Sequence, residues 1–101
     1  MIRHIVMFRL KTYPSPEEKQ KAAEAVLQQL KMLPEKISVV KTFEAGINFS
    51  SESHAFDLVL DSTFDSAGDL EKYRIHPDHQ AFIAFNKDYT VEKAVVDFNI
   101  S

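Results

Sequence analysis

The sequence contains no cysteine, no tryptophan and only two glycines in its 101 residues. Without cysteine, neither a disulfide nor a thiolate metal site can form, which suits a reducing compartment, so we expect a cytoplasmic protein. With glycine only at Gly46 and Gly68, no glycine-rich loop is available to cradle a phosphate group. Apolar runs are only a few residues long, and the strand pattern starts at once, so we expect neither a membrane span nor a signal peptide.

An excess of basic residues is also missing. Twelve Lys and Arg residues stand against 15 Asp and Glu residues, the net charge is −3, and both signs are interspersed. A nucleic-acid surface needs a basic footprint, so no nucleic-acid partner is expected. Hydrophobic residues make up 45% of the chain and charged residues 27%, which is ordinary for a globular protein, and the length suits a single domain over residues 1–101.

Four segments show the alternation of apolar and polar residues that is typical of β-strands, namely residues 2–11, 37–47, 55–64 and 91–100. A helix is predicted between the first two, where Ser15 suits the N-cap, Pro16 the first helical position and Glu18 a capping box. We expect this helix to run to about Leu33, because Pro34 follows.

A second helical region is predicted between the third and fourth strands. Ser66 suits its N-cap, with Asp69 three residues later, and Leu70 and Tyr73 should lie on its buried side. His76-Pro77 should interrupt this region, and a further helix should then run to about Tyr89.

The order βαββαβ predicts an α+β fold, in which a four-stranded antiparallel sheet of ferredoxin-like type carries both helices on one face. The other face is then open. On this face we expect Arg3, Ile5, Met7, Arg9, Asp57, Val59, Asp61, Lys93, Val95 and Asp97. A half-apolar surface of this kind is usually buried against another molecule. We expect a second copy of the chain to bury it, with arginines contacting aspartates in a two-fold homodimer.

The segment Tyr73–His79 holds a phenol and two imidazoles within seven residues, and Pro77 restricts the backbone between the imidazoles. We expect it to form the mouth of a pocket. Imidazole titrates near neutral pH, so His79 can serve as a base, and the Tyr73 hydroxyl can donate to an oxygen on which charge develops. His4 points toward the helices by the alternation of its strand and can approach this pair from the sheet.

The sequence resembles the stress-responsive A/B barrel domain family along nearly its whole length. The resemblance lies in Ile2–Phe8, in Leu58–Phe64 followed by Ser66, in Tyr73 with His76-Pro77-Asp78-His79, and in Val96-Asp97-Phe98. It implies a dimeric α/β barrel with a pocket between the sheet and the helices of each subunit. The family includes plant stress proteins, bacterial members without assigned activity, and a plant cyclase that closes a polyketide by aldol condensation without a cofactor.

The resemblance to the cyclase implies that Tyr73, His79 and His4 are the catalytic residues. Val26 stands where the cyclase has a tyrosine on its first helix. The residues expected to bind a substrate are Phe8, Val26, Leu58, Leu60, His76, Phe82 and Val96, although core packing is the alternative role for most of them and turn formation for His76.

Three function classes remain open from the sequence. The first is a stress-response-type protein that binds a small apolar molecule without turnover. The second is a lyase, cyclase or isomerase that acts beside a carbonyl group and needs no cofactor. The third is a metal site formed by His4, His76 and His79, which is not preferred, because no carboxylate is clearly placed with them.

Overall fold

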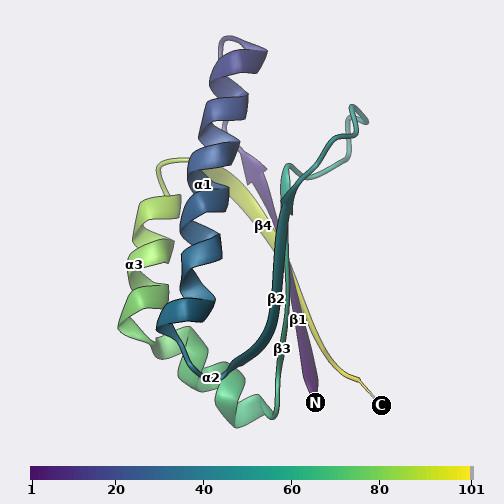
Figure 1. Cartoon of the computed structure of the whole chain (residues 1–101). Coiled ribbons are helices and arrows are strands. Elements are labelled where there is room, and N and C mark those ends of the chain that lie inside the picture. Colours follow the sequence, from purple (N-terminus) through teal and green to yellow (C-terminus); the bar gives the residue numbers. More distant parts are fainter. Residues whose placement is uncertain (101) are drawn as a thin grey trace.

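The computed structural model describes residues 1–100, which form one antiparallel sheet with all helices packed on the same face (Figure 1). The sheet order is β2-β3-β1-β4, so the first strand is central and the last strand lies at an edge. This is the predicted ferredoxin-like arrangement. The elements are β1 (Ile2–Leu10), α1 (Pro16–Lys36), β2 (Val40–Ile47), β3 (Leu58–Phe64), α2 (Ala67–Ile75), α3 (Pro77–Asn86) and β4 (Thr90–Asn99).

Strand β1 sets the two faces of the sheet, and its alternation is the one predicted. His4, Val6, Phe8 and Leu10 are buried beneath the helices, whereas their odd-numbered neighbours are only partly buried. Burying this apolar row against α1 and α3 supplies much of the driving force for folding. His4 is a polar side chain in that row, so it needs a hydrogen-bond partner.

Helix α1 begins as the sequence predicts and ends later. The Ser15 side chain accepts a hydrogen bond from the backbone N–H of Glu18 at 3.1 Å, and Pro16 is the first helical residue. The predicted end at Leu33 is wrong, because the helix continues through Pro34 to Lys36. A proline in the last turn removes only one bond of the ladder. The turn is closed beyond it by the Ile37 N–H, which donates to the Leu33 carbonyl oxygen at 3.0 Å.

The second and third strands start later than predicted. Ile37 caps α1, so β2 begins at Val40. Strand β3 begins at Leu58, and Asp57 precedes it. The Asp57 carboxylate accepts hydrogen bonds from the Leu10 N–H at 2.7 Å and lies 2.9 Å from the Lys19 ammonium. Asp57 therefore joins β1 to α1. The prediction that it lies on the open face is wrong.

The largest correction concerns β4, whose two faces are the reverse of those predicted. His4 pairs directly with Asp97, and Val6 with Val95, so these β4 residues share the helix side with the buried row of β1. Ile5 pairs with Val96, which therefore lies on the open face. Since α1 and α2 pack over β2 and β3, and no helix covers β4 to a similar extent in residues 1–100, polar side chains are tolerated on the helix side of β4.

We define the open face as the sheet surface that is turned away from the helices. Its apolar members are Ile5, Met7, Val59, Ala94, Val96 and Phe98. Val96 and Phe98 are 57% and 42% exposed. Arg3 and Asp61 on the same face lie 3.4 Å apart, so this charge pair is already formed within one subunit. The open face is thus more apolar than the sequence suggested.

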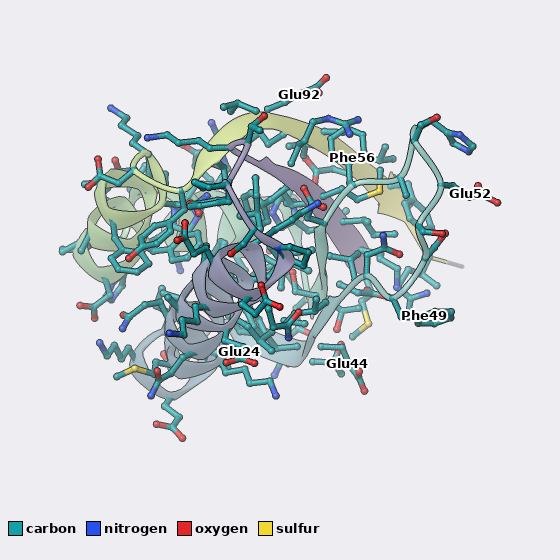
Figure 2. All side chains as sticks on the ribbon, turned by 90° about the horizontal axis from the view of Figure 1, so that it is seen from above. Glu24, Glu44, Phe49, Glu52, Phe56 and Glu92 are labelled. Carbon is teal, nitrogen blue, oxygen red and sulfur yellow. The ribbon has the colours of Figure 1, made fainter. Side chains whose placement is uncertain are left out.

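The segment between β2 and β3 extends away from the sheet, and Phe49 lies on it fully exposed (Figure 2). Its first turn is held by Asn48, whose side chain bonds to both the N–H and the carbonyl of Ser50. No helix among residues 1–100 combines the length and the apolar character needed to cross a membrane.

Candidate active site

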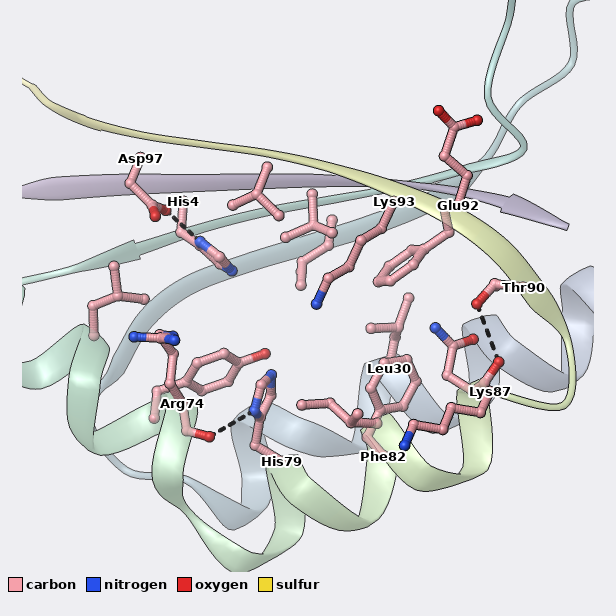
Figure 3. Close-up of a pocket in the computed structure, with 18 of the residues that line it drawn as sticks. His4, Leu30, Arg74, His79, Phe82, Lys87, Thr90, Glu92, Lys93 and Asp97 are labelled. Atoms are coloured by element: carbon pink, nitrogen blue, oxygen red, sulfur yellow. Dashed lines mark hydrogen bonds and ion pairs between the residues drawn. The ribbon is translucent and has the colours of Figure 1, made fainter.

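A pocket of about 560 Å³ lies between the sheet and the helices α2 and α3, and it opens beside β4 (Figure 3). Its floor is apolar, with Phe8, Leu30, Leu60 and Phe82 among the lining residues. Polar side chains lie at both ends, with His4, Tyr73 and His79 where α2 meets α3 and with Asn86, Lys87 and Thr90 where α3 ends (Figure 3). A mostly apolar cleft with a few convergent polar groups is the usual form of a small-molecule site.

The break between α2 and α3 positions His79. His76 is the last capping residue of α2 and the N-cap of α3, and Pro77 is the first residue of α3. His79 is therefore in the first turn of α3, where its Nδ1 lies 2.9 Å from the Arg74 carbonyl oxygen (Figure 3). A carbonyl oxygen only accepts, so Nδ1 carries the proton and Nε2 keeps a free lone pair.

Tyr73 is fully buried on α2 and lines the pocket. Its ring centre lies 4.4 Å from that of His79 and 5.1 Å from that of Phe64. The hydroxyl is buried, yet it has no hydrogen-bond partner among residues 1–100. Burial raises the pKa of Tyr73 above its usual value of 10.0, so the phenol stays protonated and keeps its proton available for donation. A buried donor without a partner is costly unless a ligand supplies the acceptor.

His4 approaches the same end of the pocket from the sheet. Its ring centre lies 6.1 Å from that of Tyr73, and its Nδ1 is hydrogen-bonded to the Asp97 carboxylate (Figure 3). The carboxylate accepts, so Nδ1 of His4 is the protonated nitrogen. The pocket thus contains two imidazoles whose Nδ1 atoms are each hydrogen-bonded to an acceptor at the rear of the ring.

The electrostatic surroundings keep His79 neutral. Burial lowers its pKa below the usual 6.5, and the charges of His4, Lys93 and Arg74 act in the same direction, against the hydrogen bond to the Arg74 carbonyl. Lys93 reaches into the pocket from β4 (Figure 3). A neutral imidazole with a free Nε2 is the form that a general base requires.

The structure brings together six of the sequence-predicted site residues and leaves out four. His4, Phe8, Leu60, Tyr73, His79 and Phe82 line the pocket. Val26 and Leu58 are fully buried core residues, because α1 packs mainly against β2 and Leu58 pairs with Ile47 of that strand. Val96 lies on the open face, because the register of β4 puts it beside Ile5.

His76 caps a helix, which agrees with the alternative role in turn formation and not with the expected role in substrate binding. Its Nδ1 accepts a hydrogen bond from the Asp78 N–H at 3.1 Å, which caps α3. It does not line the pocket with His4 and His79. Within residues 1–100, no group of three or more His, Asp and Glu side chains is arranged to hold a metal ion.

Several polar residues of the pocket were missed from the sequence. Among them, Asp97 and Lys93 were assigned to the wrong face of β4, and Asn86 was not singled out. Asn86 is buried, and its side-chain oxygen has no hydrogen-bond partner among residues 1–100. The sequence contained a signal for Asp97 and Lys93, because the alternation of the strand puts them on the same face of β4 as Val95 and Val91.

We expect His79 to titrate below its ordinary pKa of 6.5, which NMR titration of its ring protons will show. The folded state then resists protonation more than the unfolded state. The free energy of unfolding should be fully retained above pH 6.5 and should fall as the pH drops from there toward the pKa of folded His79. His79→Gln should weaken this dependence, whereas substitution of the exposed His54 should not; a midpoint at or above 6.5 contradicts the assignment.

Comparison with known proteins gives a consistent picture. The family model described as Stress responsive A/B Barrel Domain matches residues 2–100. An uncharacterized protein of Streptomyces coelicolor is 30% identical over 89 residues, which cover 88% of this chain and 90% of that protein. A dimeric protein of unknown function with a ferredoxin-like fold from Bacteroides fragilis is 30% identical, with a TM-score of 0.86 over 98% of this chain and 95% of the other.

An enzyme also shares the fold. The hydroxynitrile lyase from Passiflora edulis is similar in structure, with a TM-score of 0.81 and 21% identity over 99% of this chain and 93% of the other. At this identity, the likeness concerns the fold and not the chemistry.

Proposed function

Because the chain belongs to the stress-responsive A/B barrel domain family, we propose that its pocket takes a small carbonyl compound and removes a proton from the carbon beside the carbonyl group. The observation that carries this proposal is the buried Tyr73 hydroxyl, which has no hydrogen-bond partner among residues 1–100 and lies beside the neutral His79 imidazole. The family resemblance noted from the sequence is confirmed by the family match, which leaves the specific activity open.

The proposed step needs only a base and a donor. Nε2 of His79 takes the proton from the carbon, the C–H electron pair forms a carbon–carbon double bond, and the carbonyl π pair moves to oxygen. The Tyr73 hydroxyl donates a hydrogen bond to that oxygen as its negative charge develops. His79 then returns the proton to carbon, or the enolate carbon attacks a second carbonyl of the same molecule, closes a ring, and the resulting alkoxide takes the proton from His79. Both outcomes use the side chains alone.

His4 has a supporting role in this proposal. The Asp97 carboxylate accepts a hydrogen bond from Nδ1 of His4 and fixes the orientation of the ring. His4 lies on the sheet side of the pocket and His79 on the helix side (Figure 3), so a ligand would lie between them. We therefore assign proton transfer to His79 and contact with the ligand from the sheet side to His4.

Tyr73→Phe tests the central observation. Removing an unpaired buried hydroxyl should leave the free energy of unfolding unchanged or raise it by about 1 kcal/mol. The same change should slow protein-catalysed hydrogen–deuterium exchange beside the carbonyl of aryl ketones and aryl keto acids by about 100-fold. NMR measures the exchange and chemical denaturation the stability. Loss of stability would mean that the hydroxyl is bonded in the folded protein.

A binding protein without turnover is the second candidate, and the same orphan hydroxyl favours it, since any ligand acceptor would satisfy the donor. The exchange experiment separates the two. Ligand binding that weakens in Tyr73→Phe, without protein-catalysed exchange in the unmodified protein, would establish binding alone. Exchange that disappears in both Tyr73→Phe and His79→Gln would establish the acid–base pair.

The assembly and location complete the proposal. The Bacteroides fragilis relative is dimeric, and the apolar open face of this chain is a surface that a second copy could bury. We therefore propose a homodimer formed through the open face. The lack of cysteine supports a cytoplasmic location. A role in stress response rests on the description of the family.

A further inference from the structure

Most charged side chains that line the pocket are already paired. The Arg74 guanidinium lies 2.6 Å from a Glu71 carboxylate oxygen, and the Glu92 carboxylate accepts from Arg9 at 2.8 Å. Asp97 is bonded to His4. Two lysines of the pocket, Lys87 and Lys93, have no acidic side chain within 4.0 Å among residues 1–100. Lys87 and Lys93 are therefore the charged side chains of the pocket that the other described residues leave without an ion-pair partner.

The two lysines differ in position. Lys87 is the C-cap of α3, where the negative end of the helix dipole partly offsets its charge. Lys93 pairs with Phe8 in the sheet, on the same face as Val95, and its amino group points between the sheet and the helices (Figure 3). Its charge is felt at His79 and helps to lower the pKa of that residue, whereas Lys87 has no such effect.

An ammonium group in this place has a clear chemical preference. Lys93 lines the pocket although it is an exposed residue, and its ammonium faces the space that a ligand would fill (Figure 3). A carboxylate there would form a charge-assisted hydrogen bond, which is about twice as strong as a neutral one. A neutral ligand would leave the ammonium without a counter-charge and would gain no such bond.

We propose that Lys93 binds the carboxylate of the ligand and that the pocket is built for small keto acids. This inference rests on the proposed function, because the ketone is held at Tyr73 and His79 while Lys93 holds the other end. A cavity of about 560 Å³ has room for a molecule that carries both groups and an apolar ring over Phe8 and Phe82. Lys93 is thus a specificity-determining residue and takes no part in proton transfer.

The test compares two ligands of the same shape, 4-oxo-4-phenylbutanoate and its primary amide. Calorimetry at low salt should show that the unmodified protein binds the carboxylate at least about tenfold more tightly than the amide. Lys93→Met, which keeps the apolar stem, should reduce this preference to about twofold or less. Lys87→Met is the matched control and should keep the preference. Equal binding of the two ligands, binding of neither, or a preference that survives Lys93→Met would overturn the proposal.

A second readout requires no ligand. Lys93→Met should raise the pKa of His79 in an NMR titration, because a like charge has been removed, while Lys87→Met should leave it unchanged. An unchanged pKa in Lys93→Met would show that the ammonium does not face the pocket.

Failure of this inference and failure of the proposed function give different results. Carboxylate preference without hydrogen–deuterium exchange would leave Lys93 as an anion-binding residue of a binding protein. If hydrogen–deuterium exchange were equally fast for the keto acid and its amide, the assignment of Tyr73 and His79 as the acid–base pair would stand and the role of Lys93 in carboxylate binding would be ruled out. His79→Gln should abolish exchange while the preference for the carboxylate persists.

Discussion

Replacing Val96 by aspartate is expected to convert the proposed homodimer into monomers. Val96 lies on the open face, on the edge strand β4 beside Ile5 of the central strand β1, and 57% of its surface is exposed in the single chain. In a two-fold dimer, one substitution puts an aspartate at two places in the interface. A short carboxylate buried there without a partner costs about 2 kcal/mol per copy, which raises the dimer dissociation constant by about 1,000-fold.

The matched control is Ile75→Asp. Ile75 is 65% exposed at the end of α2, on the helix side of the molecule, and it is not part of the open face. Sedimentation should show a dimer for Ile75→Asp and a monomer for Val96→Asp at the same protein concentration. Circular dichroism should show that both variants are folded, since neither side chain is buried in the single chain. A dimer that survives in Val96→Asp would mean that the two copies meet elsewhere.

The fold could be predicted because its local signals agree with one another. The alternation of β1 places His4 and Phe8 beneath the helices, and the Ser15 and Ser66 side chains cap their helices as expected. The pair of Tyr73 and His79 was also visible, because His76-Pro77 forces a new helix to begin just before His79. These features depend on neighbouring residues in the chain.

The faces of β4 could not be predicted, because the rule that was applied assumes that the more apolar row faces the helices. Here Val96 and Phe98 lie on the open face, while Lys93 and Asp97 face the pocket. Within residues 1–100, no helix covers β4 as α1 covers β2, so this strand does not follow the expected pattern. The partner of His4 was hidden for the same reason, since the pairing of residues 4 and 97 depends on the register of two distant strands and not on local sequence.

Replacing Phe64 by alanine is expected to cause the largest loss of stability of any single change considered for this chain. Phe64 is completely buried in β3, and its ring packs against Tyr73 and His4 with centre distances of 5.1 and 6.3 Å. Truncation of a buried phenylalanine costs about 3–5 kcal/mol, through lost burial and through the cavity that remains. Chemical denaturation at a fixed protein concentration should measure this loss, since dimerisation also contributes to the apparent stability.

Phe49→Ala removes the same atoms from the fully exposed segment between β2 and β3, and it should change the free energy of unfolding by no more than about 0.5 kcal/mol. Similar losses in both variants would mean that Phe64 is not in the core. The difference between the two variants therefore measures the packing of the sheet against α2 and not the general effect of removing a phenylalanine ring.

Phe64 also connects the core to the pocket. The Tyr73 hydroxyl has no hydrogen-bond partner in the part of the chain that the structure describes, so the packing of the ring fixes its direction. That packing comes from Phe64, His4 and His79. Phe64→Leu, which keeps most of the volume, should fold with a loss below that of alanine, yet it should slow hydrogen–deuterium exchange because the hydroxyl is held less firmly. Exchange at the unmodified rate in Phe64→Leu would show that the ligand itself orients Tyr73.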